Sequence, residues 1–223
     1  ICTINKTHSY LIRKYYSRCD VVVVRDGADP SRFNPSLKSN FRKEEGIRDD
    51  TCIIVFVGSL TSSKLDDLVS VIPSFKDSNL KVIVLGSGKL KGFYQDKISN
   101  LGMSDFFEFK GFVSDEDLVD FLSISDITFS DFWSKYGFPR KVFEYLSMGK
   151  PIIVKSSLPV REVLTDGYNS FLYDDLIDFK SKISRLINEP KLRLEMGENA
   201  YLTSRNFTWS SQVKILREHV SNV

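Results

Sequence analysis

One stretch of the chain combines a turn, a helix start and a carboxylate at spacings that suit a diphosphate and a diol. It covers residues 135–154 and has the sequence KYGFPRKVFEYLSMGKPIIV. Pro139 fits a first helical turn, where its missing N–H costs nothing, and Gly137 allows close approach to the backbone. The N–H groups of a helix start carry partial positive charge, so this stretch predicts a cradle for a diphosphate.

Glu144 lies within the helix that this stretch predicts. A carboxylate accepts two hydroxyl hydrogen bonds at once, which suits a vicinal diol such as that of a ribose. The same residue is spaced i, i+4 from Arg140, so an ordinary ion pair on the helix surface explains it equally well. Lys141 could likewise be an ordinary residue on a solvated helix face and not a ligand-binding residue. From spacing alone, both interpretations stay open.

A second glycine-rich stretch, GSGKLKG at residues 86–92, follows an apolar run. It fails as a dinucleotide fingerprint because Lys91 stands at the third glycine position, and it lacks the spacing of a P-loop. A tight turn between a strand and its helix is the favoured interpretation. A backbone wall beside a nucleotide is the alternative.

Several kinds of catalytic site are excluded by what the sequence contains. The two histidines, His8 and His219, lie near opposite ends of the chain, which argues against a histidine-based triad or metal site. The cysteines (Cys2, Cys19 and Cys52) are odd in number and have no CxxC spacing. They indicate a reducing compartment, with no disulfide framework and no zinc.

The composition fits one large domain with a substantial core. The chain has 223 residues, of which 42% are hydrophobic and 27% charged, and its net charge is +2. The basic residues are scattered, so a nucleic-acid partner is not expected. The longest apolar runs are too short to span a bilayer, and no signal-peptide core is present at the start. The first residue is Ile1, and we expect the chain to be a piece of a longer protein or one of two subunits.

Short apolar runs alternate with amphipathic stretches along the chain. This alternation predicts an α/β, Rossmann-like parallel sheet with helices on both faces and a helical C-terminal extension. The expected strands cover residues 21–24, 53–57, 82–85, 106–109, 127–129, 152–154 and 170–172. The expected helices cover 65–72, 92–100, 115–123, 141–148, 176–188, 190–204 and 210–220. Ligands of such sheets bind beyond the carboxyl ends of the strands, where Gly58 and Gly86 follow two apolar runs.

The two flanks of this core differ from it. Residues 1–19 predict a short strand and a helix, and residues 26–50 predict a loop. Near the other end, Pro190 suits a helix start and Thr208 could cap the last helix.

Six stretches occur in an order that is more specific than any one of them. They are VVVVRDGADPSRFNP, IIVFVGSLTSSKLDDLV, LKVIVLGSGKL, FKGFVSDEDLVDFLSISDITF, GFPRKVFEYLSMGKPIIV and PVREVLTDGYNSFLY. This series resembles that of the retaining GT-B glycosyltransferases of group 1, also called glycosyltransferase family 4. The resemblance covers roughly residues 20–220.

The resemblance implies a role for several residues. Glu144 matches the second glutamate of the family's pattern of Glu, seven residues and Glu, which resembles a holder of the ribose diol. Lys64 matches the lysine that contacts the donor diphosphate and is the candidate catalytic residue, and Gly58 lies in the same loop. Val113 matches the backbone that meets the base, and Gly86 lines that side of the cleft.

The loop before Glu144 matches the family in part. Gly137, Phe138 and Pro139 match the loop whose amides face the distal phosphate and the sugar. Tyr136 stands where the first glutamate is expected; that carboxylate usually contacts the donor sugar, and Tyr136 can still donate a hydrogen bond. The Pro-x-Lys before Glu144, which contains Lys141, resembles one branch of the family. The departure is therefore either a branch variant or a sign of weakened catalysis.

Ser59 is the second departure, because the family has an arginine there. This substitution removes one fixed cation from the diphosphate.

The resemblance implies transfer of a sugar from a nucleoside-diphosphate sugar to a hydroxyl acceptor, with retention and without a metal ion or other cofactor. Residues 20–206 would form the nucleotide-sugar-binding domain, residues 1–19 a remnant of the acceptor domain, and residues 207–223 the C-terminal crossing helix. The alternative is a nucleotide-sugar-binding module or subunit with no activity of its own. A sugar epimerase or a pyridoxal-type phosphorylase is less well supported, because no acid/base pair and no Schiff-base lysine stands out.

The resemblance also implies partners and a location. An amino-terminal acceptor domain or subunit is expected beside the nucleotide sugar, and the location is expected to be cytoplasmic. Lipid-linked acceptors are common in the family, so basic residues at 13–18 and 38–48 could contact an anionic membrane. An ordinary solvated surface is the favoured interpretation of these residues.

Overall fold

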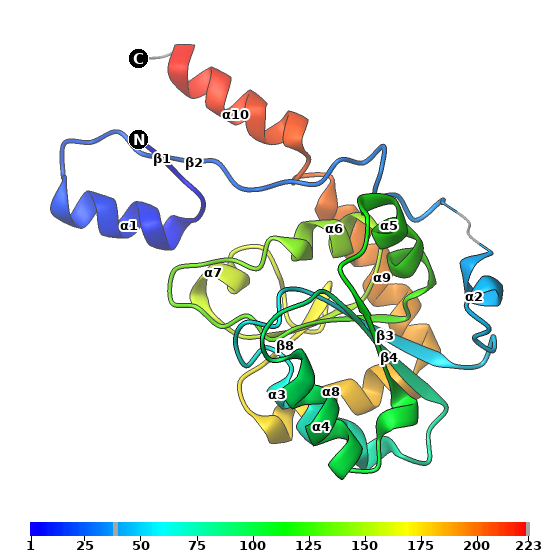
Figure 1. Cartoon of the computed structure of the whole chain (residues 1–223). Helices are drawn as coiled ribbons and strands as arrows, with labels where there is room; N and C mark the ends of the chain where they lie inside the picture. The colour runs from blue at the N-terminus through cyan, green and yellow to red at the C-terminus, as the bar shows by residue number, and fades with distance from the viewer. Residues whose placement is uncertain (38–39, 222–223) are drawn as a thin grey trace.

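The computed structural model describes residues 1–37 and 40–221. Its centre is a sheet of six parallel strands in the order β5–β4–β3–β6–β7–β8 (Figure 1). This sheet confirms the predicted α/β class. The strands are β3 (Cys52–Val57), β4 (Leu80–Leu85), β5 (Phe107–Gly111), β6 (Ile127–Ser130), β7 (Ile152–Lys155) and β8 (Ser170–Tyr173).

Helices cover both faces of this sheet, as predicted. One hydrophobic layer contains side chains of α3 (Asp66–Val71), α4 (Lys91–Asn100) and α8 (Leu176–Asn188). The other contains side chains of α5 (Asp115–Ile124) and α6 (Lys141–Ser147). Three further elements complete the connections: the 3₁₀ turns η1 (Ile72–Phe75) and η2 (Ser104–Phe106), and the short helix α7 (Leu158–Arg161).

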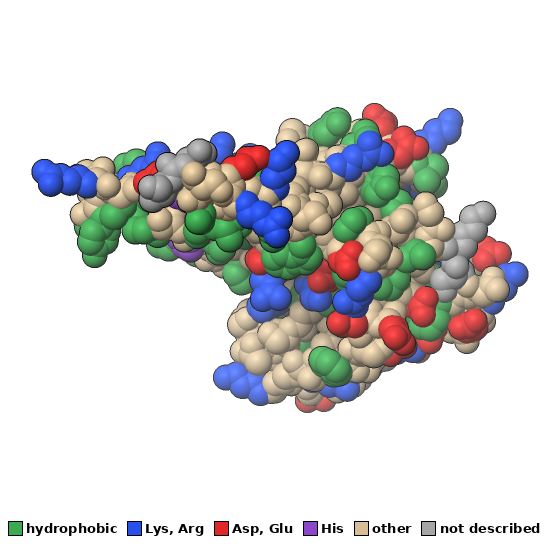
Figure 2. All heavy atoms as spheres, turned by 90° about the horizontal axis from the view of Figure 1, so that it is seen from above, with side chains coloured by type: hydrophobic (Ala, Val, Ile, Leu, Met, Phe, Trp, Pro, Cys, Tyr) green, Lys and Arg blue, Asp and Glu red, His purple; other side chains and the backbone are tan. Residues whose placement is uncertain are grey.

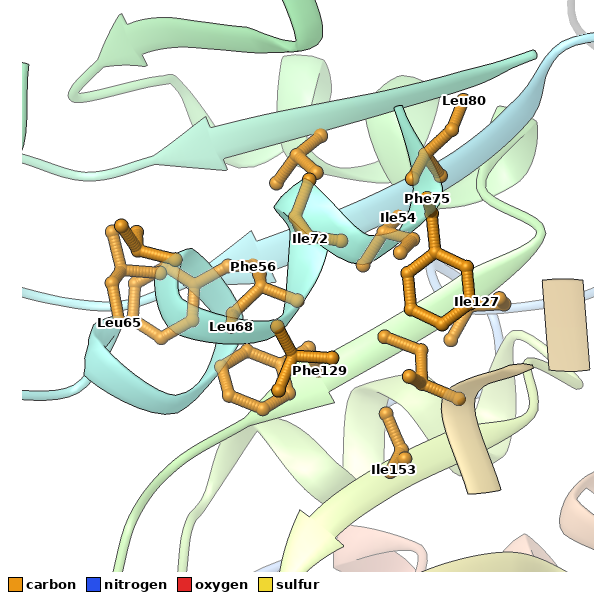
Figure 3. Packing of buried hydrophobic residues seen from close by; sticks show 14 of the residues in the cluster. Ile54, Phe56, Leu65, Leu68, Ile72, Phe75, Leu80, Ile127, Phe129 and Ile153 are labelled. Carbon is orange, nitrogen blue, oxygen red and sulfur yellow. The ribbon is translucent and has the colours of Figure 1, made fainter. Parts of the chain in front are cut away.

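The alternation of side chains along the strands explains the two layers. Ile54 and Phe56 of β3 point into the layer of α3 and α8, whereas Ile53 and Val55 point into the layer of α5 and α6. All four side chains are buried, which is why the run is apolar at every position and not at every second one. Figure 3 shows both side chains in this layer, with Phe56 near Leu68 of α3 and Ile54 near Phe75.

The chain ends form an arm outside this sheet (Figure 1). The arm contains β1 (Cys2–Thr3), α1 (Lys6–Tyr15), β2 (Val22–Val23) and α10 (Trp209–Ser221). We expected residues 21–24 to be a strand of the main sheet, but β2 pairs with β1 in a separate two-stranded sheet. Both residues of β2 are half-buried, so this valine run lacks the cover on two faces that strands of the main sheet have.

The arm carries hydrophobic side chains on its surface, and Figure 2 shows it projecting from the body of the molecule. Its large exposed hydrophobic residues are Ile1, Ile4, Tyr10, Tyr15, Tyr16, Trp209, Val213, Ile215 and Val220. Glu162 ties α1 to the body, because its carboxylate accepts from the amides of Lys6 (2.7 Å) and Thr7 (3.0 Å). The same carboxylate pairs with Arg25 at 2.6 Å.

The predicted helix boundaries at the C-terminal side agree with the structure. α9 (Pro190–Ser204) starts at Pro190, and the hydroxyl of Thr208 accepts from the amide of Ser211 at 3.1 Å, so it caps α10. Between residues 26 and 50 the prediction of a loop is incomplete, because α2 (Phe41–Glu44) forms there. A four-residue helix is too short to show a hydrophobic period in the sequence.

The basic stretch at 38–48 includes Lys38, which lies outside the described residues. Arg42 points inward, where it donates to the carbonyls of Arg48, Asp49 and Thr51 and pairs with Asp126 at 2.9 Å. This guanidinium is therefore engaged within the protein. In the described part of the chain, no helix has the length and apolar character needed to cross a membrane.

Candidate active site

A pocket of about 270 Å³ lies at the carboxyl ends of β3 and β4. Five of the predicted site residues line it: Gly58, Ser59, Gly86, Val113 and Lys141. The remaining lining residues are Val57, Leu85, Ser87, Phe112, Asp115 and Leu118. Apolar side chains and glycine backbone thus make up most of the wall, as expected for a surface that receives a flat ring.

Gly86 is the position where this wall most strictly requires glycine. Its φ of +134° lies in a region that L side chains rarely adopt, and a Cβ there would stand 2.0 Å from the carbonyl oxygen of Gly58. The amide of Gly86 donates to the carbonyl of Gly111 at 2.6 Å, so three glycine-containing loops meet at one place. The stretch at residues 86–92 therefore contains both a tight turn, in which the amide of Lys91 donates to the carbonyl of Gly88 at 3.1 Å, and the backbone wall formed by Gly86.

We predict that Gly86→Ala lowers the free energy of unfolding by about 3 kcal/mol or more, because the added Cβ meets backbone and the residue is strained. Urea denaturation measures this change. Gly92→Ala is the matched control, since a Cβ at Gly92 meets nothing within 4 Å. If both variants unfold at the same urea concentration, the packing described for Gly86 is wrong.

Glu144 lies in α6, and its side chain is only 20% exposed. Both of its carboxylate oxygens accept from Nζ of Lys141 at 3.0 Å. The ion-pair partner is therefore at i, i+3, and our expectation of Arg140 at i, i+4 is wrong. Burial raises the pKa of Glu144 and the ammonium of Lys141 opposes that rise, so the pair is held in a partly desolvated position.

Lys141 joins this carboxylate to the pocket, because it lines the pocket and contacts Glu144. A diol that binds Glu144 must share the carboxylate with this ammonium or displace it. The structure thus shows an ion pair of Glu144 with Lys141 at the wall of a pocket, and the binding of a diol by Glu144 stays a prediction.

Lys64 lies between the first pocket and a second one. Its Nζ is 3.4 Å from Oγ of Ser59, which lines the first pocket, and 5.9 Å from the ring centre of Phe132. Lys64 and Phe132 both line the second pocket, which has a volume of about 440 Å³. An anion bound beside Lys64 would therefore touch both spaces, and Ser59 contacts the ammonium at the position where the family has an arginine.

The loop before α6 uses part of its hydrogen-bonding capacity internally. Oγ of Ser134 accepts from the amide of Tyr136 at 3.2 Å and from the amide of Gly137 at 2.8 Å. We expected the amide of Gly137 to point at a ligand, so a phosphate has to compete with Ser134 for it. Phe138 packs on Phe143 of α6, with ring centres 4.9 Å apart. Pro139 precedes α6, and its carbonyl accepts from the amide of Val142 at 3.0 Å.

Tyr136 contacts the arm. Its ring centre lies 5.8 Å from that of His8, and its carbonyl accepts from Nδ2 of Asn5 at 2.7 Å. Asn5 is fully buried and also caps α1 through its side-chain oxygen. The residue that replaces the expected first glutamate is thus packed against α1.

Sequence reasoning missed four polar residues near Lys64. Lys155, at the end of β7, lies 2.8 Å from Asp67 of α3 and 3.8 Å from Asp131, which directly follows β6. The hydroxyl of Tyr173, at the end of β8, donates to Asp67 at 3.1 Å. Asp131, Lys155 and Tyr173 each lie at or directly after the carboxyl end of a strand. The rule that selected Gly58 and Gly86 would have found them.

Asp131 has a strongly perturbed pKa. The pKa of this carboxyl is raised from the ordinary 3.8 to about 7: burial is the largest cause, the negative charge of Asp67 adds to the rise, and Lys155 and the hydroxyl of Tyr173 oppose it. A carboxyl whose pKa is raised in the folded state takes up a proton more readily there than in the unfolded chain. As the pH rises from about 4 to 7, the ionisation of Asp131 therefore lowers the free energy of unfolding by a growing amount. Above that range this effect is constant.

We predict that Asp131→Asn stabilises the protein relative to wild type as the pH rises. The difference should be small near pH 4 and should reach up to about 4 kcal/mol near pH 8, because asparagine cannot ionise. Melting temperatures of both proteins across this range measure it. Asp77→Asn, at an exposed position, supplies the baseline. A difference that does not grow with pH would contradict the burial of Asp131.

Within residues 1–37 and 40–221, no three His, Cys, Asp or Glu side chains are grouped so that they could hold a metal ion. Three positively charged side chains line the two pockets and could bind a diphosphate: Lys64, Lys141 and Lys155.

Comparison with known proteins shows the family to which this chain belongs. Residues 38–203 match the family model for glycosyl transferases group 1. The match covers most of the chain, and the protein therefore belongs to the group 1 glycosyltransferases.

The individual relatives share about a quarter of their residues with this chain. The putative glycosyltransferase EpsD of Bacillus subtilis is 26% identical over 196 residues, which are 84% of this chain and 51% of EpsD. A D-inositol 3-phosphate glycosyltransferase of Corynebacterium kroppenstedtii is 24% identical over 211 residues, 88% of this chain and 47% of the relative. The chain thus spans about half the length of the curated relatives that it matches.

Among solved structures, Anabaena HepE in complex with UDP and glucose superposes with a TM-score of 0.85. The superposition covers all of this chain and 62% of HepE, at 17% sequence identity. A glycosyltransferase from Rickettsia africae has the same TM-score over 97% of this chain and 61% of its own, at 19% identity. The fold of this chain is therefore that of GT-B glycosyltransferases.

Proposed function

We propose that this chain is the donor-binding half of a retaining glycosyltransferase of family 4. It would transfer a sugar from a nucleoside-diphosphate sugar to a hydroxyl acceptor. The observation that carries the proposal is the position of Lys64, between a glycine-walled pocket on one side and a polar pocket on the other. A nucleotide sugar has its parts in the matching order: a flat base for the first pocket, a diphosphate for Lys64 and a sugar for the polar pocket.

The first pocket would hold the nucleoside. Gly58, Gly86 and Val113 provide a wall for the base, and the Lys141–Glu144 pair stands where the ribose hydroxyls would reach it. The diphosphate would lie beside Lys64 and the loop of Gly137–Pro139. HepE, which shares the fold, has been solved with UDP-glucose, and this supports the placement of such a ligand in the present chain.

In the reaction, the bond between the anomeric carbon and the diphosphate oxygen breaks, and its electron pair goes to the diphosphate. The acceptor oxygen forms the new bond to the anomeric carbon, and its proton passes to the departing diphosphate oxygen. Charge therefore develops on the leaving diphosphate, and the ammonium of Lys64 would stabilise it. The proposed mechanism needs no metal ion or other cofactor, because fixed cations of the protein supply this stabilisation.

An amino-terminal acceptor domain or subunit would complete the enzyme. Residues 1–19 would be a remnant of that domain, residues 20–206 the donor domain and residues 207–223 a helix that crosses back. The exposed hydrophobic side chains of α1 and α10 support this arrangement, since both helices belong to the arm outside the main sheet. We propose a cytoplasmic location, which suits the free thiols of Cys2, Cys19 and Cys52. Peripheral association with a membrane that presents a lipid-linked acceptor stays a prediction.

The second candidate function is a nucleotide-sugar-binding subunit without activity of its own. It is favoured by Tyr136, which stands where a glutamate is expected and contacts the arm. The two functions separate in an assay of donor hydrolysis and sugar transfer, with and without an added amino-terminal half. We expect transfer only in the reconstituted protein. Absence of transfer after reconstitution, with nucleotide binding intact, would favour the binding subunit.

A further inference from the structure

Most residues that line the second pocket, beside Lys64, have no role in the proposed binding of the nucleoside and the diphosphate. Its lining includes three carboxylates, two lysines, two hydroxyls and two aromatic rings. These residues are Asp66, Asp67, Asp131, Lys64, Lys155, Ser62, Ser63, Phe132 and Trp133. The second pocket lies next to the first, because Nζ of Lys64 in its lining is 3.4 Å from Oγ of Ser59, which lines the first pocket.

This composition suits a hydroxylated sugar ring. Such a ring has an edge of hydroxyl groups, which carboxylates and ammonium groups bind, and apolar C–H faces, which pack on aromatic rings. Trp133 lines this pocket and is 63% exposed, so much of its ring is available to a ligand. Deep in the same pocket, the side chain of Asp131 is only 8% exposed.

The four charged and polar groups around Asp131 fix its position and leave it capacity to bind. Lys155 pairs most closely with Asp67, at 2.8 Å, and lies 3.8 Å from Asp131. The hydroxyl of Tyr173 bonds to Asp67 at 3.1 Å and also interacts with Asp131, and Asp66 contributes a more distant negative charge. Asp67 is thus occupied by two close donors, whereas a carboxylate such as Asp131 can still accept hydroxyl hydrogen bonds.

Tyr136 is badly placed for the same task. Its ring packs beside His8, its carbonyl accepts from Asn5, and its backbone is held by Ser134. Asp131, only five residues earlier in the same loop, faces the pocket that contains Lys64. A carboxylate is therefore present beside the diphosphate position even though the expected glutamate is absent.

We propose that the second pocket binds the sugar of the donor, with Asp131 accepting its hydroxyl hydrogen bonds and Trp133 covering one face of its ring. This inference rests on the proposed function, because it assumes that a nucleoside diphosphate occupies the first pocket. It makes Asp131 and Trp133 the residues that determine which sugar is accepted. Lys155 positions Asp131 and does not itself have to touch the sugar.

The test compares each nucleotide sugar with its own free diphosphate. Calorimetry at pH 8 measures the affinities of this chain for UDP and UDP-glucose, GDP and GDP-mannose, and ADP and ADP-glucose. The pair with the highest affinity is then measured with Asp131→Asn and Trp133→Ala. Asp77→Asn and Trp209→Ala are the matched controls, because both side chains are exposed away from the two pockets.

In the wild type we expect the nucleotide sugar to bind more tightly than its free diphosphate. Each pocket variant should weaken the nucleotide sugar by about tenfold and leave the free diphosphate unchanged. Trp133 is largely exposed, so its variant keeps the test valid if Asp131→Asn alters the fold. The controls should change neither affinity.

Three results would overturn the inference. Equal binding of nucleotide sugar and free diphosphate by the wild type would show that the pocket contributes nothing to the sugar. Equal losses for both ligands in the variants would assign the pocket to the diphosphate, and unchanged nucleotide-sugar affinity in both variants would leave it open to an acceptor sugar. If none of the six nucleotides binds the wild type, the proposed function fails, and this inference fails with it.

Discussion

Replacement of Lys64 by alanine in the complete enzyme is expected to lower the rate of sugar transfer by about 100-fold to 1000-fold. The structure gives the physical reason. Lys64 lies at the junction of the two pockets, and its nearest polar neighbour in that loop is the neutral hydroxyl of Ser59. With serine in place of the family's arginine, no second fixed cation in this loop can compensate for the lost ammonium.

Single-turnover rates at saturating donor measure the chemical step in this variant. Lys64→Arg should retain part of the rate because the charge is kept, and Lys76→Ala, at an exposed position, should behave as wild type. A rate for Lys64→Ala close to that of wild type would remove Lys64 from the mechanism. A weaker donor affinity with an unchanged rate would restrict its role to binding.

The second large effect is expected at Glu144. Glu144→Gln should weaken the binding of UDP by about tenfold, because the amide loses a charge-assisted hydrogen bond to a ribose hydroxyl. The complication is Lys141, which contacts both carboxylate oxygens at 3.0 Å. Loss of this ion pair alone could alter the pocket wall, so the measurement has to separate the two effects.

A ligand that lacks one hydroxyl separates them. Calorimetry with UDP and 2′-deoxy-UDP should show that Glu144→Gln penalises UDP more than the deoxy nucleotide, because only UDP presents the vicinal diol. Glu195→Gln, on the exposed side of α9, serves as the control substitution. Equal penalties for the two nucleotides would mean that Glu144 acts through Lys141 and does not bind the ribose.

The sheet was predictable because its strands are short, apolar on both faces and separated by regular helical patterns. The run at 53–57 shows this most clearly, since its side chains are buried in alternating layers. The run at 21–24 has the same composition and lies outside the sheet. Composition alone cannot distinguish the two, because what differs is the tertiary cover of each strand.

The sequence predicted which loops of the backbone form the candidate site. It was less successful in predicting which side chains contact one another there. Gly58 and Gly86 follow strands, and the structure brings them together as the rule for parallel sheets predicts. Lys141 could not be identified as the partner of Glu144, because i, i+3 and i, i+4 spacings are equally compatible with a helix. The bonds of Ser134 to the loop amides and the packing of Tyr136 against His8 depend on tertiary contacts that spacing does not reveal.

The central claim is that a nucleoside diphosphate binds this chain at the carboxyl ends of β3 and β4. Its most direct test is the melting temperature of the chain with UDP, GDP and ADP at saturating concentrations, because a ligand that binds only the folded state stabilises it. We predict that at least one of the three raises the melting temperature by about 5–10 °C at 100 times its dissociation constant. The same nucleotide should raise that of Lys64→Ala by less. An unchanged melting temperature with all three nucleotides would contradict the account.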